Sequence, residues 1–215
     1  MEKMIERIVS FTVDGKKMQS FLCTPDRLDE LATGYLLAQR YIETNDAIAG
    51  ITVDGLCVTV KTQSGIGDTL TMEERVERLR PYKGERMVSM QAAKELMQRL
   101  MQVENYYGTH CLALQTEEAV YFREDVGRHN AMDKVIGRGA MDGVDFSKCM
   151  VAATGRISVE MLVKAASVGI PTILSKKYPS DLSEELAEQM NVCIIGKMLA
   201  KAPVIYAAAR RVAFS

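Results

Sequence analysis

The residues best suited to chemistry lie close together, in the span 124–139. Its sequence, EDVGRHNAMDKVIGRG, combines carboxylates, arginines, a lysine and an asparagine with one of the chain's two histidines. Side chains four residues apart share a helix face, so a helix here would align Asp125, His129 and Asp133. Carboxylates on either side would fix the imidazole tautomer and favour its charged form. These three residues are candidate catalytic groups; the alternative is a solvated, ion-paired helix face.

A second group that could react is His110 followed directly by Cys111. A cysteine beside a cationic imidazole can act as a thiolate nucleophile, provided that the site is exposed. Adjacent residues of a strand point to opposite faces, however, so the two side chains need not meet. A buried, inert Cys111 is the alternative that the general burial of cysteine favours.

The five cysteines are dispersed and form no CxxC pair. This pattern argues against a disulfide framework and against a structural zinc site, and we expect no metal. Three of the cysteines, Cys57, Cys149 and Cys193, lie in apolar, strand-like runs and are predicted to be buried.

The first third of the chain alternates between turn signals and apolar runs. Asp14-Gly15 predicts a hairpin turn within 5–21, Thr24-Pro25 predicts the start of a helix that ends near Ile42, and Asp54-Gly55 predicts a second hairpin. A highly charged stretch then predicts an exposed connecting loop. The expected division is an N-terminal hairpin–helix–hairpin part (1–62), a flexible connecting loop (63–88) and a second domain (89–215).

The second domain begins with a helix capped by Ser89, followed by a hairpin of strands at 111–115 and 119–122. Short apolar strands at 149–153, 171–175 and 192–195 alternate with helices, one beginning near Ser158 and the other near Ser180 or Ser183. This order predicts a parallel βαβαβ unit and an α/β (α+β) fold class. Ligands of such sheets bind outside the carboxyl ends of the strands, which here are the loops 154–158, 176–180 and 196–202.

The first of these loops is suited to bind an anion. Gly155 lets the backbone turn closely, Arg156 can hold an oxyanion, and Ser158 stands where a helix N-terminus offers donors. The alternative is an ordinary strand-to-helix turn with a capping serine. Further positive charge on the same edge comes from Lys176, Lys177, Lys197 and Lys201.

Overall charge indicates neither a nucleic-acid-binding nor a membrane protein. The formal net charge is −1 and the pI is about 6.2. No apolar run reaches the roughly 18 residues of a transmembrane helix, and the charged N-terminus does not resemble a signal peptide. We expect a cytoplasmic protein.

Several of these motifs together resemble the FdhD/NarQ family of formate dehydrogenase accessory proteins. The resemblance rests on EDVGRHNAMDKVIG, YGTH, ATGRISVEMLVKAASVGIP and TPDRLDELATGYLLAQRYI, and it spans nearly the whole chain. It implies a cytidine-deaminase-like fold with three layers and a homodimer. It also implies transfer of sulfur from a cysteine desulfurase to the molybdenum cofactor, molybdopterin guanine dinucleotide, before that cofactor enters formate dehydrogenase.

The resemblance, together with the loops expected at the carboxyl ends of the strands, indicates which residues would contact the cofactor. They are Glu124, Arg128, Asn130, Lys134, Gly155, Arg156, Ser158, Gly196, Lys197, Met198, Leu199, Ala200, Lys201 and Ala202.

The chain departs from the family pattern at three places. Tyr107 stands where a glycine is usual, the arginine expected soon after Gly196 is missing, and the connecting loop lacks the CxxC pair that carries sulfur. Persulfide relay needs a thiolate, and only Cys111 with His110 is placed to supply one. The alternative is therefore a cofactor chaperone or maturation scaffold without sulfurtransferase activity. A PCxxC segment is also absent, so zinc-dependent deamination is rejected.

Overall fold

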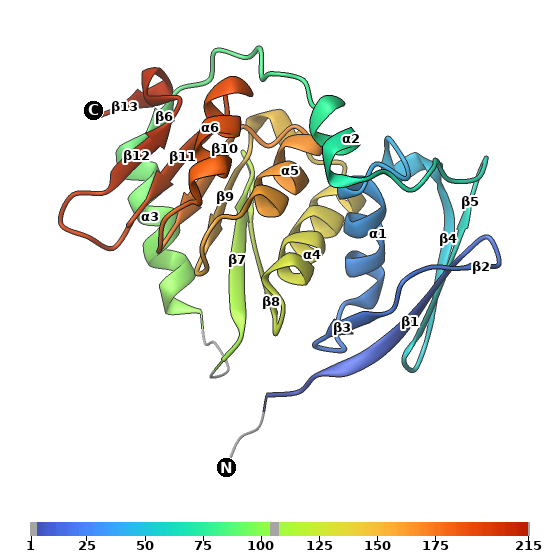
Figure 1. The fold of residues 1–215 in the computed structure, drawn as a ribbon. Coiled ribbons are helices and arrows are strands. Elements are labelled where there is room, and N and C mark those ends of the chain that lie inside the picture. Colours follow the sequence, from blue (N-terminus) through green and yellow to red (C-terminus); the bar gives the residue numbers. More distant parts are fainter. Residues whose placement is uncertain (1–3, 104–107, 215) are drawn as a thin grey trace.

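The computed structural model describes residues 4–103 and 108–214, and a mixed sheet lies at its centre (Figure 1). The strand order is β12-β11-β10-β9-β7-β8. Strands β9, β10 and β11 are parallel, whereas β7 is antiparallel to both of its neighbours. The predicted parallel βαβαβ unit and the hairpin before it are thus confirmed. The strands are β7 (His110–Gln115), β8 (Val120–Asp125), β9 (Met150–Ala153), β10 (Thr172–Ser175), β11 (Cys193–Gly196) and β12 (Val204–Ala207).

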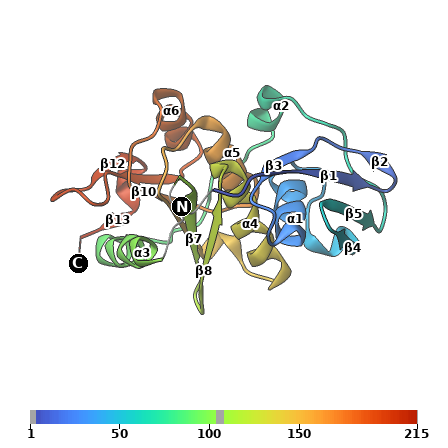
Figure 2. The ribbon, with the colours of Figure 1, turned by 90° about the horizontal axis from the view of Figure 1, so that it is seen from below.

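Helices cover both faces of this sheet (Figures 1 and 2). Alternating residues of β7 face opposite sides. Cys111 and Ala113 belong to the hydrophobic cluster with α3 (Met90–Gln102), and Leu112 and Leu114 to the cluster with α4 (Arg128–Met141). The crossover helices α5 (Val159–Ser167) and α6 (Asp181–Gln189) share the side of α4. Among the described residues, no helix has the length and apolar character needed to cross a bilayer.

A smaller sheet lies beyond α4, with α1 (Leu28–Ala38) between them (Figure 2). Both predicted hairpins are confirmed, and Asp14 and Gly15 have the positive φ values, 48° and 78°, that suit a two-residue hairpin turn. The sequence did not indicate that β1 and β5 pair in parallel. The strands are β1 (Arg7–Val13), β2 (Lys16–Lys17), β3 (Phe21–Cys23), β4 (Ile48–Asp54) and β5 (Cys57–Thr62).

The prediction that Thr24-Pro25 opens the first helix is wrong, because α1 begins at Leu28. Arg27 adopts a left-handed conformation, with φ 48°, which no helix can continue. Thr24 instead forms hydrogen bonds with the span 124–139, hereafter the central motif. Its N–H donates to Asp125, and its hydroxyl accepts the N–H of Val126.

The connecting segment 63–88 is not loop throughout. It contains α2 (Met72–Glu77), which begins at a capping box formed by Thr71 and Glu74, and Arg75 and Leu79 are buried. Its end, β6 (Val88–Ser89), pairs with β13 (Val212–Ala213), and Ser89 caps α3 as predicted. One hydrophobic cluster contains residues of both the N-terminal part (1–62) and the part that begins at residue 89. The division of the chain into domains stays a prediction. Short 3-10 helices lie at Asn45–Ala47, Phe146–Lys148 and Ala209–Arg211.

The N-terminal part of the chain meets the central sheet domain where α1 crosses α4, at the glycine pair Gly34 and Gly137. A Cβ atom on Gly34 would lie 1.8 Å from the carbonyl oxygen of Asp133, and one on Gly137 would lie 1.9 Å from that of Glu30. Neither position leaves room for a methyl group. The helix backbones therefore touch directly, as small residues allow.

Replacing Gly34 or Gly137 by alanine should destabilise the protein by at least about 3 kcal/mol, because the added methyl group overlaps backbone that cannot move independently. Urea unfolding followed by circular dichroism measures the change. Gly50→Ala is the matched control, since a Cβ there meets no atom within 4 Å. Equal stability of the three variants would show that the helices do not cross at these glycines.

Candidate functional site

The three loops predicted at the carboxyl ends of the parallel strands are bonded to one another. Between the first two, the N–H of Ile157 donates to the carbonyl of Tyr178 over 3.3 Å. Between the second and third, the N–H of Lys197 donates to the carbonyl of Lys177 over 2.6 Å. These bonds hold the loops side by side at one edge of the sheet, as expected for this topology.

The start of the central motif reaches the same edge. Because β7 is antiparallel to β9, His110 at its beginning lies beside the turn that follows β9. A Cβ on Gly155 would lie 3.2 Å from His110 Nδ1 and 3.8 Å from Arg128 Cδ. On the other side of that turn, His129 Nε2 is 3.5 Å from Glu160 Oε2. The structure thus brings the central motif together with the turn from Gly155 to Ser158, hereafter the GR-x-S turn.

The carboxylate partner of His129 is not the one that helical spacing predicts. Asp133 instead forms a buried ion pair with Lys164, whose Nζ is 2.7 Å from both carboxylate oxygens. His129 and Asp133 lie four residues apart on α4, and Glu160 and Lys164 lie four apart on α5. The two helices are therefore joined by two successive pairs, His129–Glu160 and Asp133–Lys164.

Both histidines are shifted toward the neutral form, so the predicted charged imidazole is wrong. Burial lowers the pKa of His129, and Lys164, Arg128 and His110 lower it further, against the opposing effect of Glu160. The pKa of His110 is lowered by burial and then by Arg128. Burial also raises the pKa of the Asp133 carboxyl to about 6, against the effect of Lys164. The site thus offers neutral imidazoles beside permanently charged guanidinium groups.

At the start of α5, the buried Ser158 Oγ has no hydrogen-bond partner among the described residues. On the neighbouring helix α4, the buried His129 Nε2 makes no hydrogen bond either, but it lies 3.5 Å from the Glu160 carboxylate. Ser158 occupies the N-cap position of α5, but its hydroxyl makes no capping bond, contrary to our expectation. The half-buried Arg128 and the exposed Arg156 lie in the same region. The unpaired Ser158 hydroxyl, the two arginines and the helix N-terminus together are suited to bind an anion, although Glu160 adds opposing charge.

Other residues of the central motif bond within the protein. Asp125 is fully buried, and Asn130 donates to it over 3.0 Å. Lys134 is also fully buried, with its Nζ 3.0 Å from the Thr24 carbonyl, 2.5 Å from Asp26 Oδ1 and 2.8 Å from Asp125 Oδ2. This network fastens the start of α4 to the segment before α1. A ligand could reach the Lys134 ammonium only if these bonds broke.

The predicted site residues at either end of this edge differ in accessibility. The Thr109 hydroxyl donates to Glu124, which is half-buried, and Tyr107 lies outside the described residues. Gly196 is buried, since a Cβ there would lie 2.7 Å from both the Lys177 carbonyl oxygen and a Tyr206 ring carbon. The loop that follows Gly196 buries Met198 and exposes Lys197, Leu199, Ala200, Lys201 and Ala202.

Among the described residues, no accessible thiol lies at the site. Cys111 is fully buried in the cluster with α3, whereas His110 faces Gly155, and burial raises the pKa of the Cys111 thiol to about 12. Burial is confirmed for Cys149 and Cys193, but Cys57 is exposed, because its side chain points outward just after the β4–β5 turn. Within the described part of the chain, no three histidine, cysteine or carboxylate side chains gather to hold a metal ion.

Sequence reasoning missed Glu160 as the partner of His129. Glu160 and Lys164 have the same i, i+4 spacing as His129 and Asp133, with charges in the complementary order. That match could have suggested two neighbouring helices.

The stability that the two histidines contribute should fall as pH drops below about 6.5, because both resist protonation in the folded chain more than in the unfolded chain. Their contribution is complete above that pH and is lost on acidification. His129→Gln, which does not titrate, should lose less stability between about pH 7.5 and about pH 5.5. Urea unfolding at several pH values compares the two proteins. The raised pKa of the Asp133 carboxyl affects stability in the opposite direction, but this carboxyl is present in both the native protein and the variant. Identical pH dependence would contradict the inferred shift of His129.

Known proteins resemble this chain over nearly its whole length. A family model described as the FdhD/NarQ family matches residues 4–213. The sulfur carrier protein FdhD of Methanothermobacter thermautotrophicus is 31% identical, and the match covers 98% of this chain and 92% of that protein. The Bacillus subtilis protein of the same name is 27% identical, with coverage of 86% of this chain and 80% of that protein. A crystal structure of a formate dehydrogenase accessory protein from Desulfotalea psychrophila has the same fold, with a TM-score of 0.87, 24% identity, and coverage of 97% of this chain and 90% of that one. The chain belongs to the FdhD/NarQ family.

Proposed function

We propose that this protein assists the maturation of formate dehydrogenase by binding molybdopterin guanine dinucleotide as a client at the carboxyl edge of the sheet. In this proposal it acts in the cytoplasm as a homodimer, with a cysteine desulfurase and formate dehydrogenase as partners. Family membership and the names of the relatives support the general role.

The observation that carries the cofactor proposal is the buried Ser158 Oγ at the start of α5, which has no hydrogen-bond partner among the described residues. Buried polar groups rarely lack partners, so such a group at a surface edge suggests a ligand. A phosphate oxygen would accept from the Ser158 hydroxyl and the free backbone N–H groups of the first turn. Arg128 and Arg156 would balance its charge.

A nucleotide suits this edge better than a bare phosphate does. Tyr178 in the second loop and Leu199 in the third are each 50% exposed, so apolar surface is available beside the proposed phosphate position. An exposed tyrosine ring can stack on a planar base. Beside the phosphates, neutral His129, whose Nε2 faces Glu160, would orient the site or pass a proton.

GDP is a simple probe of this site. We expect calorimetry to detect binding, and Arg156→Ala or Ser158→Ala to weaken it about tenfold, because each removes a donor to phosphate. The control is Arg99→Ala, which removes an exposed arginine from α3 on the other face of the sheet. Failure of GDP to bind at about 1 mM, or equal affinity of Arg156→Ala and the native protein, would refute the nucleotide site.

Sulfur transfer is a separate proposal and depends on Cys111. Its thiolate would attack the outer sulfur of the desulfurase persulfide, the S–S bond of that persulfide would break, and the desulfurase cysteine would leave as a thiolate. The burial and raised pKa of Cys111 oppose this step in the described conformation. They favour the second candidate function, a cofactor chaperone or maturation scaffold that uses no thiol.

Mass spectrometry separates these two functions. After incubation with a desulfurase and cysteine, a sulfur carrier should gain about 32 Da on Cys111. Complementation of a strain that lacks its accessory protein, with Cys111→Ala beside the native chain, provides the second readout. We expect Cys111→Ala to complement, because the thiol is buried. An adduct on Cys111 together with loss of complementation would establish the sulfur carrier and exclude the thiol-free scaffold.

A further inference from the structure

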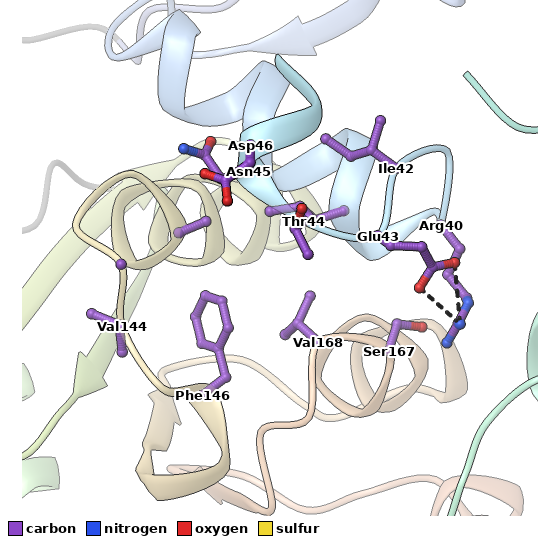
Figure 3. Close-up of a pocket in the computed structure, with 13 residues that line it drawn as sticks. Arg40, Ile42, Glu43, Thr44, Asn45, Asp46, Val144, Phe146, Ser167 and Val168 are labelled. Carbon is purple, nitrogen blue, oxygen red and sulfur yellow. Dashed lines mark hydrogen bonds and ion pairs between the residues drawn. The ribbon is translucent and has the colours of Figure 1, made fainter. Parts of the chain in front are cut away.

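A pocket lies at the opposite ends of the helices that form the candidate site. Helices α4 and α5 begin at that site, and their last turns line a cavity of about 330 Å³ together with the end of α1 (Figure 3). The volume lies at the lower end of the range for small-molecule pockets. Nothing in the proposed function uses this cavity.

One wall of the cavity is apolar. The side chains of Phe146 and Val168 point into it in Figure 3, and Leu37, Ile42 and Val144 extend the apolar lining. Such a wall favours a ligand with a hydrocarbon body, because a ligand that covers it removes apolar surface from water.

The same cavity contains two polar atoms that lack partners. Arg40 Nε and Ser167 Oγ are buried, and neither has a hydrogen-bond partner among the described residues. Through Nη2, the Arg40 guanidinium lies 3.3 and 3.5 Å from the carboxylate oxygens of the exposed Glu43. A ligand carboxylate that displaced the side chains covering Arg40 Nε and Ser167 Oγ would find two unused donors, the Nε–H and the serine hydroxyl.

The backbone gives an independent reason to regard Arg40 as functional. The N–H of Arg40 donates to the Leu37 carbonyl and that of Tyr41 to the Leu36 carbonyl, which is the Schellman pattern at a helix end. Arg40 occupies its left-handed position with φ 62°, where glycine is favoured. A long side chain held in an unfavourable backbone conformation at a pocket indicates a role for that side chain.

We propose that this cavity binds a small organic monocarboxylate that has an apolar body. The carboxylate is held by Arg40 and Ser167, and the body packs against Phe146 and Val168. The helix ends contribute carbonyl groups, and Glu43 and Asp46 contribute negative charge. Dianions such as phosphate are therefore disfavoured here, in contrast to the site at the other end of the helices.

Phenylacetate tests the proposal, since its ring and single carboxylate match the lining. We expect calorimetry or ligand-observed NMR to detect binding below about 10 mM, and phenylacetamide to bind about tenfold more weakly. Arg40→Gly should also bind phenylacetate about tenfold more weakly and remain folded, because glycine suits this backbone position. Ser167→Ala should weaken binding as well.

The matched control is Arg138→Gln, which removes an arginine that pairs with Asp142 outside the cavity and should leave affinity unchanged. Equal affinity of native protein and Arg40→Gly would overturn the proposal. Equal binding of phenylacetate and phenylacetamide would do the same, since it would show an apolar cavity without carboxylate recognition. GDP binding serves as an independent readout, because it reports on the other end of the helices.

Discussion

The direct contact between the backbones of α1 and α4 is the constraint on which the rest of this structure depends. Gly34 meets the carbonyl of Asp133, so the first half of α4 is held against α1 with no side chain between them. The same region of α4 carries His129 and Asp133. A shift of α1 would therefore move the imidazole that faces the GR-x-S turn, and the N-terminal part of the chain helps to position a site to which it contributes no proposed ligand group.

Buried charges extend this constraint to both sides of α4. Lys134 joins α4 to the segment before α1, and Lys164 joins α4 to α5 while lying 5.6 Å from the centre of the Tyr35 ring. Buried ion pairs contribute little net stability, but breaking one costs about 3–5 kcal/mol, so they penalise other arrangements of the helices. Their role here is to define how α1, α4 and α5 are placed relative to one another.

Local patterns predicted most elements correctly, and long-range pairing explains where prediction was wrong. The Asp14-Gly15 and Asp54-Gly55 turns, the parallel strands and the helix at the central motif follow from spacing and turn chemistry alone. The partner of His129 does not, because Glu160 lies on another helix and the i, i+4 rule considers one helix at a time. Thr24 has the same explanation: it resembles a helix start, but its backbone and hydroxyl bond a motif about a hundred residues away.

The central claim is that the start of α5, with Arg128, His129, Arg156 and Ser158 around it, is a phosphate-binding site. The most direct measurement is a crystal structure of the protein with GDP. We expect a diphosphate within hydrogen-bond distance of Ser158 Oγ and the first-turn N–H groups of α5, with at least one of the two arginines beside it. GDP bound at another surface, with Ser158 Oγ still unpartnered, would contradict the phosphate site.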